Sequence, residues 1–106
     1  MTPEEVVHRF FDRVHSGDVS VCDLYTEDGI RVDHEGRQFC GREAIADVYR
    51  AMFPLPDSHP EVAALHTNPP FVAAIMQWPE GSGRVGQYID LFEISGDLIQ
   101  ALRVLV

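Results

Sequence analysis

The stretch from Gly86 to Ile94, GQYIDLFEI, constrains the fold more than any other part of the sequence. As a β-strand, it places successive side chains on opposite faces, so Tyr88, Asp90 and Phe92 share one face. Asp90 then lies among aromatic and aliphatic neighbours. An ionised carboxylate is costly on an apolar face, so we expect Asp90 to be paired, to bind a metal, or to be protonated because burial raises its pKa.

The length and composition predict one globular domain over residues 1–106, with 45% hydrophobic residues. There is no apolar run of transmembrane length and no signal-peptide pattern, so we expect a cytoplasmic protein without a membrane partner. The net charge is -9, and the arginines do not cluster, which disfavours nucleic-acid binding. No lysine occurs in the sequence, which excludes a Schiff-base lysine or a P-loop lysine among these residues.

Cysteine and histidine positions give no indication of a metal or redox site. Cys22 and Cys40 are too few for a disulfide framework or a zinc knuckle, and we expect reduced thiols. The histidines lack the His-x-x-x-His spacing of a ligand pair, so we expect no metal. His34 differs from the others because it adjoins Asp33 and could tune its pKa.

Capping and turn residues predict helices first and strands afterwards. Thr2, Pro3 and Glu5 make a capping box that starts a helix ending near Ser16. Periodicity and turn residues predict the remaining elements, which are helices over Asp18–Tyr25 and Arg42–Phe53, a break at Glu27–Gly29, a helix stop at Pro54 and Pro56, a loop over Pro79–Gly83, and strands over Ile30–Glu35, Arg37–Cys40, Glu61–His66, Phe71–Trp78, Arg84–Ile94 and Leu98–Val106. This order predicts an α+β fold with three N-terminal helices on one face of a curved, mostly antiparallel sheet.

Several short stretches along nearly the whole chain match one known superfamily. They are VVHRFF at Val6–Phe11, SGD at Ser16–Asp18, LYTEDG at Leu24–Gly29, VD at Val32–Asp33, GREAIADVYR at Gly41–Arg50 and YIDLF at Tyr88–Phe92. In these residues the chain resembles the nuclear-transport-factor-2-like superfamily, and within it the SnoaL-like and ketosteroid-isomerase-like enzymes. The resemblance implies a cone-shaped fold that encloses a pocket, and a homodimer.

The resemblance also implies catalytic roles for two aspartates. Ketosteroid isomerases combine an aspartate base with an oxyanion hole made by a tyrosine and a protonated aspartate. Asp33 matches the base and Asp90 matches the protonated acid, whereas Phe10 stands where the tyrosine is expected. Tyr25 and Tyr49 fall where the family carries supporting tyrosines. The implied function is cofactor-free proton transfer on a hydrophobic carbonyl compound that is steroid-like or polyketide-like.

We expect the substrate pocket to be lined by aromatic and apolar side chains. The candidates are Phe10, Tyr25, Tyr49, Met52, Trp78, Tyr88 and Phe92.

Alternative roles stay open for both aspartates and for the whole protein. Asp33 shares a strand face with Arg31 and Glu35, which fits a surface ion pair. Asp90 fits a structural acid bonded to Tyr49 or to backbone amides. The alternative functions are a SnoaL-like cyclase, dehydratase or epoxide hydrolase that uses the same aspartates, and a non-catalytic ligand-binding or dimerisation module.

Overall fold

The computed structural model describes residues 1–55, 60–79 and 81–106. Pro56, expected to stop a helix, and Glu80, expected within a loop, lie outside these residues. The described elements are α1 (Pro3–His15), the 3-10 helix η1 (Val19–Leu24), β1 (Tyr25–Val32), β2 (Gln38–Cys40), α2 (Arg42–Met52), β3 (Glu61–Asn68), β4 (Phe71–Gln77), β5 (Gln87–Ser95) and β6 (Leu98–Leu105). The α+β class is therefore confirmed.

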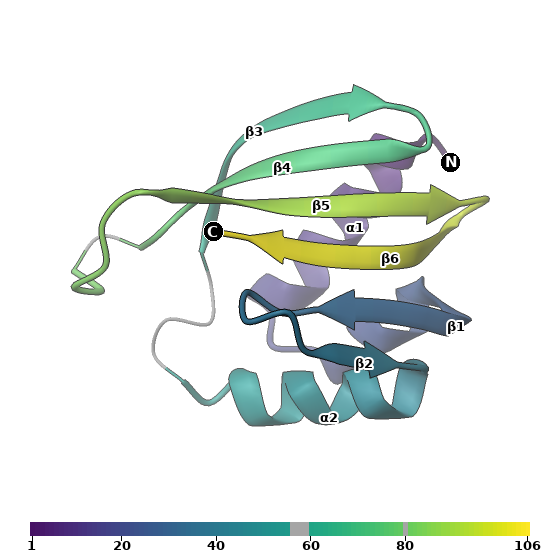
Figure 1. Cartoon of the computed structure of the whole chain (residues 1–106), viewed down its shortest axis with the longest axis horizontal. Helices are drawn as coiled ribbons and strands as arrows, with labels where there is room; N and C mark the ends of the chain where they lie inside the picture. Colours follow the sequence, from purple (N-terminus) through teal and green to yellow (C-terminus); the bar gives the residue numbers. More distant parts are fainter. Residues whose placement is uncertain (56–59, 80) are drawn as a thin grey trace.

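The strands of the described residues form one six-stranded sheet in the order β2-β1-β6-β5-β4-β3. All neighbours are antiparallel except β1 and β6, which are parallel. Figure 1 shows α1 crossing behind the curved sheet and α2 running along the β1–β2 end. No helix of the described part of the chain is long and apolar enough to cross a membrane.

The start of α1 has the predicted capping box. Thr2 Oγ1 accepts a hydrogen bond from the Glu5 amide at 3.2 Å, and Glu5 Oε1 accepts one from the Thr2 amide at 3.1 Å. Both bonds satisfy amides that the first helical turn leaves without a partner. The apolar stripe of α1 faces the sheet and is buried, and it consists of Val6, Val7, Phe10, Phe11 and Val14.

The predicted facing of β5 is confirmed. Along this strand the buried residues alternate with half-buried ones, and the buried ones are Tyr88, Asp90, Phe92 and Ile94. They face the helices, so the strand places an acid in the core of the protein. Burying an ionised carboxylate there costs much more free energy than burying an apolar side chain.

The predicted boundaries that differ most from the structure lie before and within β1. The segment after Asp18 forms a 3-10 helix that ends at Leu24, and Tyr25 already belongs to β1. The strand also continues through the expected break at Glu27–Gly29 and stops at Val32. Pairing with β6 overrides the turn preference of this segment. The pairing is irregular, because the segment from Tyr25 to Ile30 lies opposite the shorter segment from Ile99 to Ala101.

Gly29 makes this irregularity possible. A Cβ atom at Gly29 would lie 3.0 Å from both the carbonyl oxygen of Thr26 and the Cβ of Tyr25, so a side chain here would fit only if these neighbours moved. Beyond the irregularity, Arg31 pairs with Leu102 and Val32 with Arg103. Because paired residues of parallel neighbours share a face, Arg31 points to the same side as the buried Leu102.

Candidate active site

A cavity of about 470 Å³ lies between α1, the C-terminal part of α2 and the concave face of the sheet. Its wall is mostly apolar, and the two buried charged residues of the described chain, Arg31 and Asp90, both line it. The other lining residues are Phe10, Phe11, Val14, His34, Tyr49, Met52, Leu55, Pro60, Trp78, Arg84, Tyr88, Leu102, Val104 and Val106. An apolar hollow with a few converging polar groups is the usual form of a small-molecule site.

Asp90 is held in apolar surroundings by its place in the middle of β5. Its partners across the sheet are Ala74 on β4 and Val104 on β6, neither of which can hydrogen-bond through its side chain. Asp90 is 7% exposed, and no group of the described residues hydrogen-bonds its carboxyl group. Burial raises the pKa of Asp90 to about 7, although the charge of Arg31 acts in the opposite direction.

Arg31 brings a buried guanidinium to the same cavity. The residue is 9% exposed, and its Nε and Nη1 groups are buried with no hydrogen-bond partner among the described residues. Its third nitrogen, Nη2, lies 3.9 Å from Met52 Sδ, which is a weak acceptor. The cation therefore reaches the cavity wall with its hydrogen-bonding capacity largely unused.

Two tyrosines fix the position of Arg31. The guanidinium lies over the ring of Tyr49, with Cζ 5.4 Å from the ring centroid, which is within the range of a cation–π interaction. The hydroxyl groups of Tyr25 and Tyr49 are hydrogen-bonded to each other at 2.7 Å, and both residues are buried. Burial raises the pKa of both tyrosines, so they remain neutral hydrogen-bonding groups.

Part of the cavity wall is a group of aromatic and charged side chains. The rings of Trp78 and Tyr88 lie 4.7 Å apart between centroids, and Arg84 Cζ lies 4.6 Å from the centroid of the Trp78 ring. The charged or titratable groups that share the cavity with Asp90 are Arg31, His34, Tyr49, Arg84 and Tyr88. No group of three potential metal ligands gathers within residues 1–55, 60–79 and 81–106.

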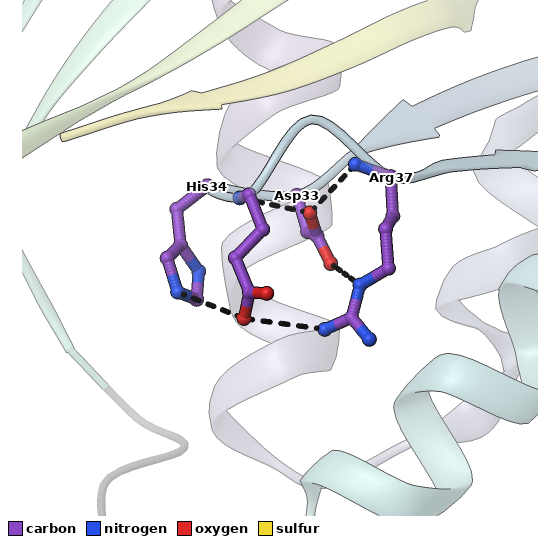
Figure 2. Close-up of polar contacts among 4 residues, drawn as sticks. Asp33, His34 and Arg37 are labelled. Carbon is purple, nitrogen blue, oxygen red and sulfur yellow. Dashed lines mark hydrogen bonds and ion pairs between the residues drawn. The ribbon is translucent and has the colours of Figure 1, made fainter.

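Asp33 does not share this cavity with Asp90. It follows the end of β1, where one carboxylate oxygen accepts hydrogen bonds at 2.9 Å from the amides of Glu35 and Arg37, and the other accepts one from Arg37 Nε (Figure 2). Burial raises its pKa, but the hydrogen bonds from Arg37 and Glu35 outweigh this effect and lower it. Asp33 borders a second, more open hollow, which shares Arg31, His34, Met52 and Leu55 with the first.

The structure thus separates the two carboxylates that the sequence placed in one site. Five of the expected pocket residues line the cavity, and they are Phe10, Tyr49, Met52, Trp78 and Tyr88. Tyr25 and Phe92 do not line it. Tyr25 lies behind Tyr49, and Phe92 lies behind Phe10, with 5.1 Å between the ring centroids of the two phenylalanines. The catalytic and substrate-binding roles of all these residues stay predictions.

Arg31 is the main site residue that sequence reasoning missed. Ile30 and Val32 indicate that their face of the strand is the apolar one, and strict alternation then places Arg31 at the surface. A signal was nevertheless present, because Asp28-Gly29 inside an otherwise strand-like run is typical of a bulge, and a bulge changes which residues face the core.

Comparison with solved structures identifies the fold. A cystatin-fold protein from Novosphingobium aromaticivorans aligns with a TM-score of 0.82 at 17% identity, over 100% of this chain and 99% of that chain. A putative polyketide cyclase from Sinorhizobium meliloti gives 0.82 at 16% identity, over 98% and 99% of the two chains. A ketosteroid isomerase-like protein from Catenulispora acidiphila, solved with trimethylamine, gives 0.78 at 16% identity, over 96% and 85%. At these identities the likeness shows the fold alone.

The family is identified from the sequence itself. No curated protein matches the chain. A sequence model of the SnoaL-like domain, however, matches residues 7–102, which include most of α1, the whole sheet up to the middle of β6, and both buried charged residues. The protein therefore belongs to the SnoaL-like domain family.

Proposed function

We propose that the protein is a cofactor-free enzyme that transfers a proton on a hydrophobic carbonyl compound, with Asp90 as the acid–base group. The observation that carries this proposal is a carboxyl group in an apolar cavity with a pKa of about 7 and no hydrogen-bond partner among the described residues. A catalytic acid or base works best when its pKa lies near the working pH, because both protonation states are then populated.

The chemistry follows from the two charged residues of the cavity. The Asp90 carboxylate removes a proton from the carbon beside the carbonyl group, and the electron pair of that C–H bond moves toward the carbonyl oxygen. Arg31 supplies positive charge where the oxygen becomes negative, in a site of low polarity. Asp90 then returns its proton to another carbon of the same conjugated system, which leaves an isomer and restores the carboxylate.

This proposal moves the base from Asp33 to Asp90. Arg37 and the backbone hold Asp33 in the turn after β1, and this position favours a structural role. The oxyanion partner also changes, because Phe10 has no hydroxyl group and the Tyr49 hydroxyl is bonded to Tyr25. In the proposal, Arg31 stabilises the negative oxygen instead.

Deuterium exchange tests the proposal whatever the product of the reaction is. Wild type is incubated in heavy water with steroid enones and polyketide-like diketones, and mass spectrometry follows deuterium uptake beside the carbonyl group. We expect exchange above the buffer rate and a loss on the order of a hundred-fold in Asp90→Asn. Asp33→Asn is the matched control, because its carboxylate lies outside the cavity.

Three results would contradict the assignment. Equal exchange in wild type and Asp90→Asn would remove Asp90 from the chemistry. Loss in Asp33→Asn with normal exchange in Asp90→Asn would return the base to Asp33. No exchange with any ketone in wild type would contradict proton transfer itself and favour the non-catalytic binding module.

A cyclase is the second candidate, and the putative polyketide cyclase from Sinorhizobium meliloti is the comparison that favours it. The first step would be the same. The substrate carbanion that forms when Asp90 removes the proton can attack a second carbonyl group of the same substrate molecule. Mass spectrometry separates the two outcomes, since ring closure with loss of water lowers the mass and isomerisation does not.

The same family resemblance supports a homodimer, and a cytoplasmic location stays a prediction from the sequence. Relatives commonly pair through the outer face of the sheet, which here is the face opposite α1. Light scattering at several concentrations should give twice the mass of one chain, and a constant monomer mass would refute the dimer.

A further inference from the structure

Arg31 has a structural requirement that the described residues do not meet. Buried guanidinium groups are stable in proteins when their N–H groups have acceptors and their charge has a counter-charge. Nε and Nη1 of Arg31 have no acceptor among the described residues, and both are closed to water. The guanidinium therefore lacks a hydrogen-bond acceptor.

The neighbouring groups do not supply that acceptor. Asp90 makes no ion pair with Arg31, and its raised pKa leaves it largely uncharged below pH 7. The Asp33 carboxylate accepts three hydrogen bonds in the turn after β1, two from Arg37 and one from the Glu35 amide. Tyr49 offers only the face of its ring, because its hydroxyl group is bonded to Tyr25.

Among the described residues, the one atom hydrogen-bonded to the guanidinium is easily displaced. Met52 Sδ approaches Nη2 at 3.9 Å, and a thioether is a weak acceptor on an unbranched, adaptable side chain. Met52 also lines the cavity, so a small movement of this side chain would open Arg31 to a ligand. A carboxylate oxygen would make a shorter, charge-assisted hydrogen bond in its place.

We propose that the cavity binds an apolar carboxylic acid, with the carboxylate on Arg31 and the hydrophobic body against Phe10, Trp78 and Tyr88. This proposal rests on the proposed function and narrows it, because the carbonyl compound would then be an oxo acid. The volume of about 470 Å³ suits a small aromatic or branched acid, and the lining away from Arg31 is mostly apolar.

Binding of 4-phenylbutyrate and its neutral isostere 4-phenylbutanamide tests the proposal. Trp78 is the single tryptophan of the chain and lines the cavity, so its fluorescence reports occupancy, and calorimetry gives the dissociation constants. We expect the acid to bind about ten-fold to a hundred-fold more tightly than the amide, which is the range for hydrogen bonds to a charged group. The cation 4-phenylbutylamine should bind more weakly than either.

Two variants test whether the preference for the acid over the amide comes from Arg31. Arg31→Gln should bind the acid and the amide alike. Arg103 lies on β6 between the cavity-lining residues Leu102 and Val104 but faces away from the cavity, where it pairs with Glu93. Arg103→Gln therefore removes an equal charge near the site and should keep the preference for the acid. If Arg31→Gln does not fold, Arg31→Lys keeps a charge, loses the planar donor set, and should reduce the preference.

Equal affinity for acid and amide in wild type, no binding of the acid, or a retained preference in Arg31→Gln would overturn the proposal. Its failure is distinguishable from that of the proposed function. Acid binding without deuterium exchange would leave the anion site standing and remove the catalysis. Deuterium exchange on neutral ketones without acid binding would leave the catalysis standing and remove the anion site.

Discussion

Replacing Asp90 with asparagine should change how the stability of the protein depends on pH. Burial raises the folded-state pKa of this carboxyl from the ordinary value of 3.8 to about 7, so the protonated acid favours the folded state. This contribution is complete below the unfolded-state pKa and is lost as the pH rises through the folded-state pKa. Asparagine has nearly the same shape as the protonated acid and does not titrate.

The magnitude follows from the size of the shift. Between pH 5 and about 6 the Asp90 proton is bound almost entirely in the folded state, so wild type loses about 1.4 kcal/mol per pH unit from this group, and the loss per unit falls to about half of this at pH 7. Relative to wild type, Asp90→Asn should therefore gain about 2 kcal/mol between pH 5 and 7. The other acidic groups titrate in both proteins and cancel in the difference.

Urea unfolding of both proteins from pH 5 to 8 measures this difference directly. The two stability curves should diverge up to about pH 7 and run parallel above it. Parallel curves over the whole range would refute a buried, protonated Asp90. Infrared difference spectroscopy of wild type against Asp90→Asn gives a second readout, because a carboxylic-acid band must be present at pH 6 and reduced at pH 8.

Three further predictions concern the framework around the site. Gly29→Ala should lower the free energy of unfolding by about 1–3 kcal/mol in urea titrations, because its Cβ would overlap Tyr25; an unchanged midpoint would contradict the tight fit. Tyr49→Phe should cost about 1–3 kcal/mol by leaving the Tyr25 hydroxyl without a partner, and removal of both hydroxyls should cost less than the sum of the two single changes. The affinity for 4-phenylbutyrate should fall as the pH rises above 7 in wild type, where Asp90 becomes charged, and stay flat in Asp90→Asn; the same pH dependence in both proteins would assign it to another group of the cavity.

Sequence reasoning predicted the parts of the structure that depend on local and regular patterns. The capping box of α1 needs only Thr2, Pro3 and Glu5, and α2 lies between Gly41 and a proline. Asp90 could be identified because β5 is regular between Gln87 and Glu93, so alternation alone decides its facing.

The part of the site that lies on β1 could not be predicted in the same way. Alternation placed Asp33 and Arg31 on one strand face, but the strand ends at Val32 and the chain turns, so the face no longer includes Asp33. The facing of Arg31 depends on its register with β6, which lies about 70 residues later in the sequence. The local pattern Asp28-Gly29 indicates a bulge, but it does not contain the register with β6 that decides the facing.

The irregularity in β1 also determines how easily the ligand preference of this cavity could change. Tyr25 is anchored at the start of the strand, because its hydroxyl bonds Tyr49 and its carbonyl oxygen accepts a hydrogen bond from Arg42 Nε at 2.8 Å. Deleting one residue between Tyr25 and Ile30 would therefore draw the later part of the strand back by one position, and Val32 would take the inward position of Arg31. A single-codon deletion would exchange a cationic wall for an aliphatic one. If the cavity binds acids on Arg31 as proposed, such a deletion would remove the preference for acids over neutral compounds while leaving the cavity residues of the other strands unchanged.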